Sequence, residues 1–383
     1  MTQQNESGPT NGAAPGRTAR ATERTDAPMY LARYRDRRKT DQDGAPVQQP
    51  ADQTPLYLRR FRSRPARDED LGATVVWEGE QLGHTRGWAE VTRTKELPGA
   101  GHPLAAQVST VAHLIRHGET QGYSTESGLT PLGSWQAHRR GFDLSKAVQP
   151  GEQVRLICAD TNRARQTAEH LQRGLLDGLA QWRKDADVGP VTAMPEFQNF
   201  QVATPTGLRD VTAAFREYLE LMERYERTAT GDRPGWMIEV DRFWRTQAGG
   251  GDPIHHWLSI PMLYFEPATS TVRRFWSGIR RAAAEHPGAR LLIATHSGPI
   301  RAFATWAVGY DPGEPYNTEE VLVRLFDSGR QASVGYRNRV QEVLVPQVEL
   351  LPDWYADAAA RSSRAAIEQA RLAAAEPTIG GRG

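Results

Sequence analysis

The sequence predicts an α/β fold, a three-layer sandwich in which a mostly parallel sheet is flanked by helices on both faces. From residue 111 onward, apolar runs typical of buried strands alternate with segments that carry helix signals. The predicted strands cover 111–116, 154–158, 191–193 and 290–295. Polar residues follow each of them, which is how open α/β sheets build active sites. Two further runs, 321–326 and 332–338, predict a hairpin at the edge of the sheet.

Helix signals follow these strands. Thr130 is a suitable N-cap, and Pro131 occupies the first helical position, where proline is tolerated. Two more helices are expected to begin near 162 and 298. Residues 206–287 are expected to form a mostly helical insertion with a glycine-rich break at 249–251. Core packing is the default role of its aromatic residues and lining a substrate cap is the alternative; they are Trp236, Phe243, Trp244, Trp257, Tyr264 and Phe265.

Composition narrows the possible classes of function. A formal net charge of +1 over 383 residues gives no whole-chain argument for binding nucleic acid or a membrane. The one cysteine, Cys158, lies in an apolar run without an internal disulfide partner, as expected for a core residue in a reducing compartment. No apolar stretch approaches the length needed to cross a bilayer, and the first thirty residues lack the apolar segment of a signal peptide. We therefore expect a cytoplasmic protein.

The chain divides into four segments by composition. Residues 1–70 are polar and rich in arginine and predict a disordered arm, because such a segment buries too little apolar surface to offset its ordering entropy. Residues 71–107 are read as a short extension and linker. The main domain is expected over 108–350, and 351–383 as a C-terminal helix and tail. This helix, over 354–376, is expected to lie on the domain or in solvent rather than to bind a partner.

The arm contains a repeated pattern. Tyr30–Arg37 matches Tyr57–Arg64 at the Tyr-Leu pair, at the Arg-aromatic-Arg core and at the closing arginine. One interpretation is arginine-rich low complexity. The other is a duplicated docking motif, in which aromatic anchors and guanidinium groups bind an acidic protein partner or scaffold. The sequence leaves both interpretations open.

The residues at the strand ends suit phosphoryl transfer; they are Arg116, His117, Arg163, Glu196 and His296. Catalysis of this reaction is mainly positioning and electrostatic stabilisation, and arginines hold phosphate oxygens by charge-assisted hydrogen bonds. A neutral imidazole is a competent nucleophile near neutral pH. A carboxyl group can protonate the leaving alkoxide and then deprotonate the water that cleaves a phosphohistidine. Because arginines would supply the positive charge, we expect neither a metal nor a cofactor.

Four motifs, in this order, resemble the histidine phosphatase superfamily, also called the phosphoglycerate mutase-like family. They are Arg116-His117-Gly118-Glu119-Thr120, Leu-Thr-x-x-Gly-x-x-Gln-Ala at 129–137, Arg163-Ala164-x-Gln166-Thr167-Ala168 and Thr295-His296-Ser297-Gly298. The resemblance covers about residues 108–345. It implies that His117 is the phospho-accepting nucleophile and that Arg116, Arg163 and His296 form the phosphate pocket. It also implies that Glu196 is the proton donor, and we expect Glu119 to fix the loop.

Departures from the family pattern favour a phosphatase over a mutase. Tyr123 stands where mutases carry a phosphate-binding asparagine, so its hydroxyl is a candidate contact to the substrate. No Gly-Glu-Ser segment lies between 252 and 290, and no basic residue follows Glu196 as it does in mutases. Asn199 and Gln201 are candidate polar contacts to the substrate.

The sequence thus predicts a phosphomonoester hydrolase that acts on a phosphorylated small molecule through a phosphohistidine. The alternatives are mutase-type phosphotransfer and a non-catalytic module that binds phosphate or a partner. The non-catalytic module is disfavoured because the set of catalytic residue types is complete. The adjacent His255 and His256 point in different directions, so we assign them a structural or rim role rather than a metal site.

Overall fold

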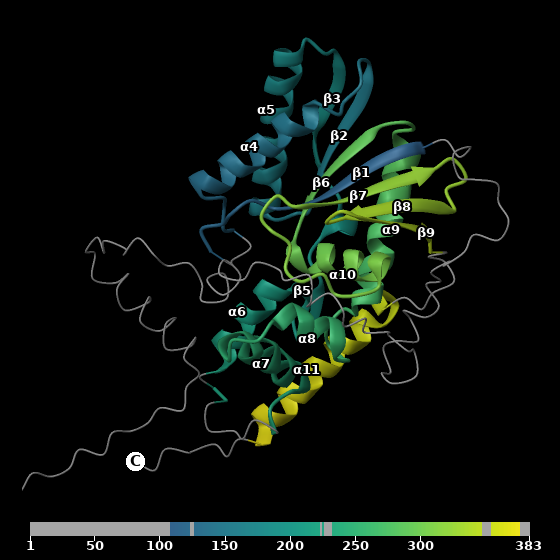
Figure 1. The fold of residues 1–383 in the computed structure, drawn as a ribbon. Coiled ribbons are helices and arrows are strands. Elements are labelled where there is room, and N and C mark those ends of the chain that lie inside the picture. The colour runs from purple at the N-terminus through teal and green to yellow at the C-terminus, as the bar shows by residue number, and fades with distance from the viewer. Residues whose placement is uncertain (1–107, 123–125, 223, 226–231, 347–353, 376–383) are drawn as a thin grey trace, which may run out of the picture. The chain divides into compact units, whose positions relative to one another are not determined.

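A computed structural model of the protein describes residues 108–122, 126–222, 224–225, 232–346 and 354–375 (Figure 1). The predicted arm, the predicted extension over 71–107 and the candidate contact Tyr123 lie outside these residues.

One seven-stranded sheet organises the described part of the chain, in the order β3-β2-β6-β1-β7-β8-β9. Its strands are β1 Val108–Arg116, β2 Glu152–Cys158, β3 Ala186–Ala193, β6 Arg290–Thr295, β7 Glu320–Phe326, β8 Gln331–Tyr336 and β9 Arg339–Leu344. The first four in spatial order pair in parallel, and the last three pairings are antiparallel. The α/β prediction is confirmed, with a mixed sheet. The sequence predicted the hairpin of β7 and β8. It did not predict β9, which follows β8 after a tight turn and adds a strand to the sheet.

Helices cover both faces of the sheet (Figure 1). On one face, α4 Pro131–Ser145 and α5 Asn162–Trp182 pack in a core that includes Leu292 and Ala294 of β6. On the other face, α9 Ala268–Glu285 and α10 Ser297–Val308 pack in a core that includes Leu291 and Ile293 of the same strand. All four β6 residues are fully buried because a central strand covered on both faces alternates between two apolar layers. Cys158 is also buried, as predicted, and burial raises the pKa of its thiol to about 11.

The chain between β3 and β6 forms the insertion and one flanking helix. It begins with the 3-10 helix η3 Pro195–Phe197 and the two-stranded sheet of β4 Gln201–Thr204 and β5 Gly207–Asp210. It continues as α6 Val211–Met222, α7 Gly235–Ala248 and α8 Pro253–Ser259. The small sheet was not predicted. Helix α9, which the sequence grouped with the insertion, instead packs against α10 and β1 through its apolar stripe.

The aromatic residues of the insertion form a core, as the default interpretation predicted. The ring of Phe200 stacks on that of Trp257, with ring centroids 4.1 Å apart. Phe243 and Phe265 also pack against the Phe200 ring. Five of the six predicted residues are buried and Trp244 is half-buried; the buried ones are Trp236, Phe243, Trp257, Tyr264 and Phe265.

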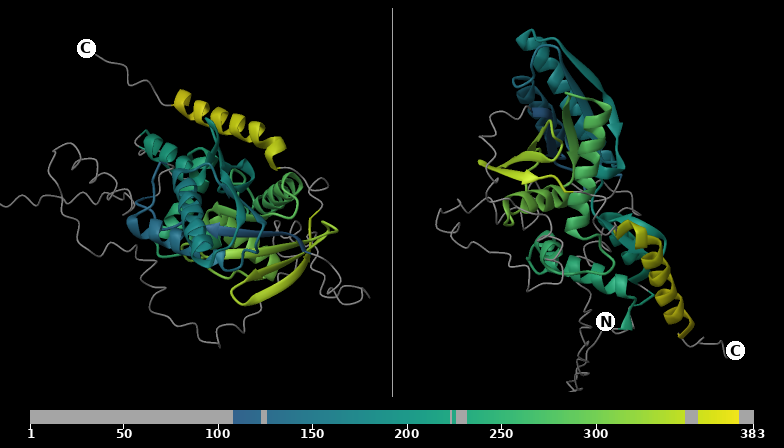
Figure 2. Two further views of the ribbon diagram at one scale, coloured as in Figure 1. Left: turned by 90° about the horizontal axis from the view of Figure 1, so that it is seen from above. Right: turned by 90° about the vertical axis from the view of Figure 1, so that its right-hand side faces the viewer.

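The C-terminal helix lies on the domain. It consists of the 3-10 turn η6 Trp354–Asp357 followed by α11 Ala358–Ala375. Helix α11 contacts β4, β5 and α7, and Figure 2 shows it in yellow beside these elements. Its Glu368 carboxylate accepts a hydrogen bond of 2.9 Å from the backbone N–H of Gly235, at the start of α7. Within the described residues, every helix is too short or too polar to span a bilayer.

Candidate active site

The last residues of β1 deliver His117 to the carboxyl edge of the sheet. Its backbone N–H donates a 2.9 Å hydrogen bond to the Thr295 carbonyl at the end of the neighbouring strand β6. The ring Nδ1 lies 2.8 Å from the Gly118 carbonyl oxygen. A carbonyl oxygen can only accept, so Nδ1 carries the proton in the neutral ring and Nε2 keeps its lone pair. The backbone thereby orients the His117 ring and leaves the lone pair of Nε2 unprotonated.

A close approach of two glycines fixes the turn after His117. A Cβ atom on Gly118 would lie 2.4 Å from the carbonyl oxygen of Gly133, in the first turn of α4. A Cβ on Gly133 would lie 2.1 Å from the Glu119 carbonyl oxygen. Both motifs therefore need glycine so that the catalytic turn can sit against the helix start. The Gly118 N–H also donates to the Thr167 hydroxyl at 3.1 Å.

The polar residues of the motifs hold the same turn. The Gln136 side-chain oxygen accepts from the Glu119 N–H at 3.0 Å, and the Gln166 side-chain oxygen accepts from the Leu129 N–H at 2.7 Å. The hydroxyl of Thr130, the predicted N-cap of α4, accepts from the Gly133 N–H and donates to the Glu119 carboxylate at 2.7 Å. Glu119 therefore fixes the loop, as its place in the sequence suggested.

His296 and Arg163 meet His117 from two other elements. His296 follows β6 and is only 2% exposed, and its ring centroid lies 5.4 Å from that of His117. Arg163, in the first turn of α5, is 4% exposed and donates from Nε to Nδ1 of His296 at 3.3 Å. Nδ1 of His296 thus accepts, and its Nε2–H faces the Thr161 hydroxyl at 3.3 Å.

The electrostatics of this cluster favour neutral imidazoles. The pKa of His117 is held well below its usual value, first by burial and then by the charges of Arg163 and Arg116. Burial, Arg163, His117 and Arg116 lower the pKa of His296 in the same way. The cluster is therefore positively charged through its guanidinium groups while the rings stay uncharged, which suits an anionic ligand and a nucleophilic imidazole.

Arg116 is held by a loop that the sequence did not single out. Its Nη1 contacts the Glu314 carboxylate at 3.0 Å and donates to the Pro315 carbonyl. Its Nε is buried and has no hydrogen-bond partner among the described residues. Glu314 lies between α10 and β7, where no motif marks it. Only the fold reveals that it positions Arg116.

Glu196 lies in η3, after β3, and its carboxylate faces an arginine of α9. The two guanidinium nitrogens of Arg281 lie 3.0 Å from the two carboxylate oxygens. Among the described residues, no hydrogen bond or ion pair joins the Glu196 carboxylate to His117, Arg116 or Arg163. A second α9 residue, Arg274, binds the carbonyl oxygens of Pro195, Glu196, Gln198 and Asn199 and thereby fixes the segment. Neither arginine could be recognised from the sequence, where both lie in an ordinary amphipathic helix.

The remaining candidates occupy less direct positions. Asn199 is 7% exposed, and its side-chain oxygen accepts from the Phe200 N–H and lies beside Gly298 at the start of α10. Gln201 is buried and donates to the Asn199 carbonyl, which indicates a structural role. His255 pairs with Asp311 at 2.8 Å, and the described residues contain no cluster of three or more histidine, cysteine, aspartate or glutamate side chains that could hold a metal.

The mixed sheet and this cluster together define an α/β protein with a cationic pocket built around two imidazoles. The family model of the histidine phosphatase superfamily (branch 1) matches residues 112–230 and 243–332, more than half of the chain. The chain belongs to this superfamily. The match covers Arg116, His117, Arg163 and His296, and all four motifs lie within it.

Solved structures with a similar fold include three bacterial proteins of low sequence identity. Bacillus stearothermophilus YhfR is 19% identical, with 57% of this chain and 93% of that chain covered at a TM-score of 0.36. The α-ribazole phosphatase of Shigella flexneri is 19% identical, with coverages of 62% and 96% and a TM-score of 0.34. A phosphoglycerate mutase of Bacillus anthracis is 14% identical, with coverages of 63% and 95% and a TM-score of 0.33. No match is found among curated proteins.

Proposed function

We propose that this protein is a phosphomonoester hydrolase that forms a phosphohistidine on Nε2 of His117. The observation that carries the proposal is the orientation of His117, whose Nδ1 is bound to the Gly118 carbonyl while Arg163 and Arg116 lie close enough to lower its pKa. The superfamily to which the chain belongs is consistent with a phosphorylated small molecule as the substrate.

Each side chain of the cluster has a place in this reaction. Nε2 of His117 attacks phosphorus, the bond to the substrate oxygen breaks, and the phosphoryl group is transferred to the ring. Arg116, Arg163 and the Nε2–H of His296 bind the non-bridging oxygens, whose charge the guanidinium groups balance. Because these groups carry the positive charge, the proposed reaction needs no metal. Tyr123 and Asn199 are proposed as further contacts to the substrate.

Glu196 is proposed as the general acid and base. It would give a proton to the leaving alkoxide in the first step and accept one from water in the second. In the structure the Glu196 carboxylate is paired with Arg281, so this role requires the carboxylate to exchange that partner for the substrate. Arg281 is 46% exposed, so its side chain has room to move into solvent when the carboxylate takes the substrate as its partner.

The test is to trap the intermediate. Full-length protein with EDTA present is mixed with a 32P-labelled phosphomonoester and quenched in alkali, since phosphohistidine is labile to acid. We expect label on His117 and inorganic phosphate as the product, and His117→Ala should lose both. Hydrolysis that continues near the normal rate in His117→Ala would refute the proposal. Conversion of 3-phosphoglycerate to its 2-phospho isomer, in the presence of a bisphosphoglycerate primer, would instead support the mutase alternative.

A further inference from the structure

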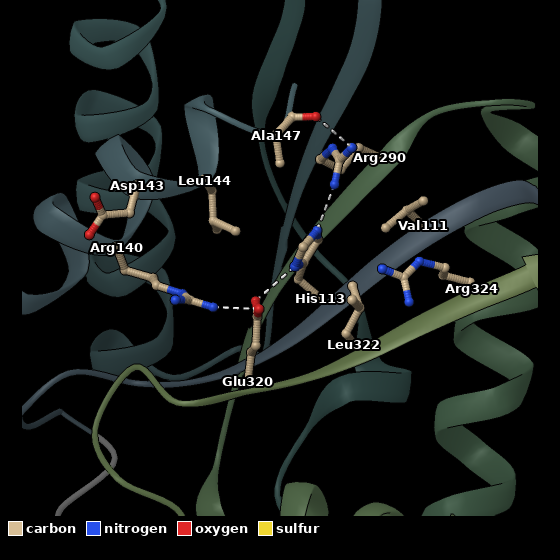
Figure 3. A pocket seen from close by; sticks show the side chains of 10 residues that line it. All are labelled: Val111, His113, Arg140, Asp143, Leu144, Ala147, Arg290, Glu320, Leu322 and Arg324. Atoms are coloured by element: carbon tan, nitrogen blue, oxygen red, sulfur yellow. Dashed lines mark hydrogen bonds and ion pairs between the residues drawn. The ribbon is translucent and has the colours of Figure 1, made fainter. Parts of the chain in front are cut away.

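A polar cavity lies on the α4 face of the sheet, away from the His117 cluster (Figure 3). Its volume is about 390 Å³, within the range of roughly 300–1,000 Å³ that small-molecule sites occupy. Arg140 lines it from α4, Arg290 from β6 and Arg324 from β7. Leu144 of α4 and Leu322 of β7 add apolar surface. Three guanidinium groups from three elements thus converge on one cavity.

Two of these arginines already have partners. Arg290 donates to the Glu152 carboxylate at 3.0 Å and to Nε2 of His113 at 2.9 Å. Because a guanidinium can only donate, His113 accepts at Nε2 and presents Nδ1–H to the Glu320 carboxylate at 2.7 Å. Arg140 pairs with the other oxygen of Glu320. Figure 3 shows the contacts that run from Arg290 through His113 and Glu320 to Arg140.

The two carboxylates that line the cavity, Glu320 and Asp143, also have cationic partners. Burial alone would raise the pKa of Glu320, but its hydrogen bonds with His113 and the charge of Arg140 lower it to about 2, so it is ionised and matched. Asp143 contacts Arg139 at 3.1 Å and Lys146 at 2.8 Å, on its own helix. Each negative charge that lines the cavity therefore has its own cation.

Arg324 is the charge that remains unmatched. Among the described residues, no hydrogen bond or ion pair joins its guanidinium to a partner, although the side chain is half-buried and points into the cavity (Figure 3). The Nε–H of Arg140 is buried and also has no partner in that part of the chain. A half-buried guanidinium without a partner, beside apolar surface, suits an anionic group attached to an apolar body.

We propose that this cavity is a second ligand site, separate from the His117 pocket, for a small organic anion. The anionic group, a phosphate or a carboxylate, binds the guanidinium of Arg324. The apolar part of the molecule packs on Leu144 and Leu322. Nothing in this assignment depends on the chemistry proposed for His117.

Isothermal titration of the full-length protein with phenylphosphonate, whose phosphorus–carbon bond is not hydrolysed, tests the proposal. We expect two classes of site, one at the His117 pocket and one at the cavity. Arg324→Gln should weaken the second class by at least about tenfold, as expected for a lost charged hydrogen bond. Arg324→Lys should retain part of that affinity. Arg330→Gln, an exposed arginine on the same hairpin, is the matched control and should bind as the unaltered protein does.

Arg163→Gln separates the two sites, because it should remove the class at the His117 pocket and leave the class at the cavity. The proposal is overturned if the unaltered protein shows a single class that Arg163→Gln removes. It is also overturned if Arg324→Gln binds phenylphosphonate as tightly as Arg330→Gln. Inorganic phosphate, which lacks the apolar part, should bind the cavity more weakly than phenylphosphonate; equal affinity would contradict the role of Leu144 and Leu322.

Discussion

At the scale of single residues, the protonation of His117 decides whether the pocket can act. A protonated ring has no lone pair on Nε2 and cannot attack phosphorus. Burial and the two neighbouring arginines lower its pKa, so the ring stays neutral to a lower pH than a free histidine, whose pKa is about 6.5. The arginines that we propose to bind phosphate therefore also favour the neutral form of His117.

Titration of His117 by NMR should show this directly. In the full-length protein we expect the ring to titrate well below pH 6.5, and Arg163→Gln should move the pKa upward because one of the charges that lower it is removed. Arg165→Gln, two residues along α5 and paired with Asp160 at the surface, is the control and should leave the titration unchanged. If His117 titrates near 6.5 in the unaltered protein, the neutral-nucleophile argument fails.

Glu196→Gln should reveal a proton donor through its dependence on the leaving group. With an alkyl phosphate we expect the rate to fall by roughly 10²–10⁴-fold, because the alkoxide needs a proton. With p-nitrophenyl phosphate the first step needs no proton, so we expect a burst of p-nitrophenolate followed by slow turnover. Glu285→Gln removes the other carboxylate near Arg281, 3.7 Å away, and should leave both rates unchanged. Equal losses with the two substrates would argue against an acid role for Glu196.

At the scale of elements, the junction between β1 and α4 is the most constrained part of the site. The turn after His117 and the first turn of α4 approach so closely that each requires a glycine. Thr130, Gln136 and Gln166 then use side-chain hydrogen bonds to hold the backbone of this junction. The sequence predicted these residues as motif positions. Each of them forms hydrogen bonds with the backbone or a side chain of another motif. Their roles, however, followed only from the contacts.

Gly118→Ala should disturb this junction. The new Cβ would lie 2.4 Å from the Gly133 carbonyl oxygen, and overpacking of this kind costs about 1–3 kcal/mol of unfolding free energy. We expect a lower urea midpoint together with a loss of phosphatase activity, since His117 moves with the turn. Gly335→Ala in β8 is the control, because the nearest atom to its Cβ would be 3.8 Å away. A Gly118→Ala protein as stable as Gly335→Ala would contradict the close approach.

At the scale of the whole molecule, the arm over residues 1–70 is the segment whose role rests on sequence alone. We propose that the repeats Tyr30–Arg37 and Tyr57–Arg64 bind an acidic protein partner or scaffold. Two tethered weak sites gain affinity from effective concentration, and guanidinium–carboxylate attraction at an exposed surface weakens with salt. The described residues include Arg116, His117, Arg163, Glu196 and His296, so we expect that the arm is not needed for the chemistry proposed at His117.

Deletion of residues 1–70 should therefore leave hydrolysis of a small phosphomonoester unchanged and reduce binding to an acidic partner. A pull-down with full-length, single-repeat and arm-deleted protein at two salt concentrations measures the second effect. We expect the single-repeat protein to retain a minor part of the avidity, and the retained part to fall further with salt. Recovery of the same partners by all three proteins, or loss of hydrolysis on deletion, would contradict a docking role.

The sequence by itself determined the α/β class, the four parallel strands, the β7–β8 hairpin and the four motif residues of the pocket. These follow from signals that are local: an apolar run, a cap, a glycine turn, or a polar residue directly after a strand. The tertiary structure alone decided that Arg281 pairs with Glu196, that Glu314 holds Arg116, and that Arg324 faces a cavity without a partner. All three depend on long, flexible side chains, whose positions are set by how distant helices, loops and strands pack together.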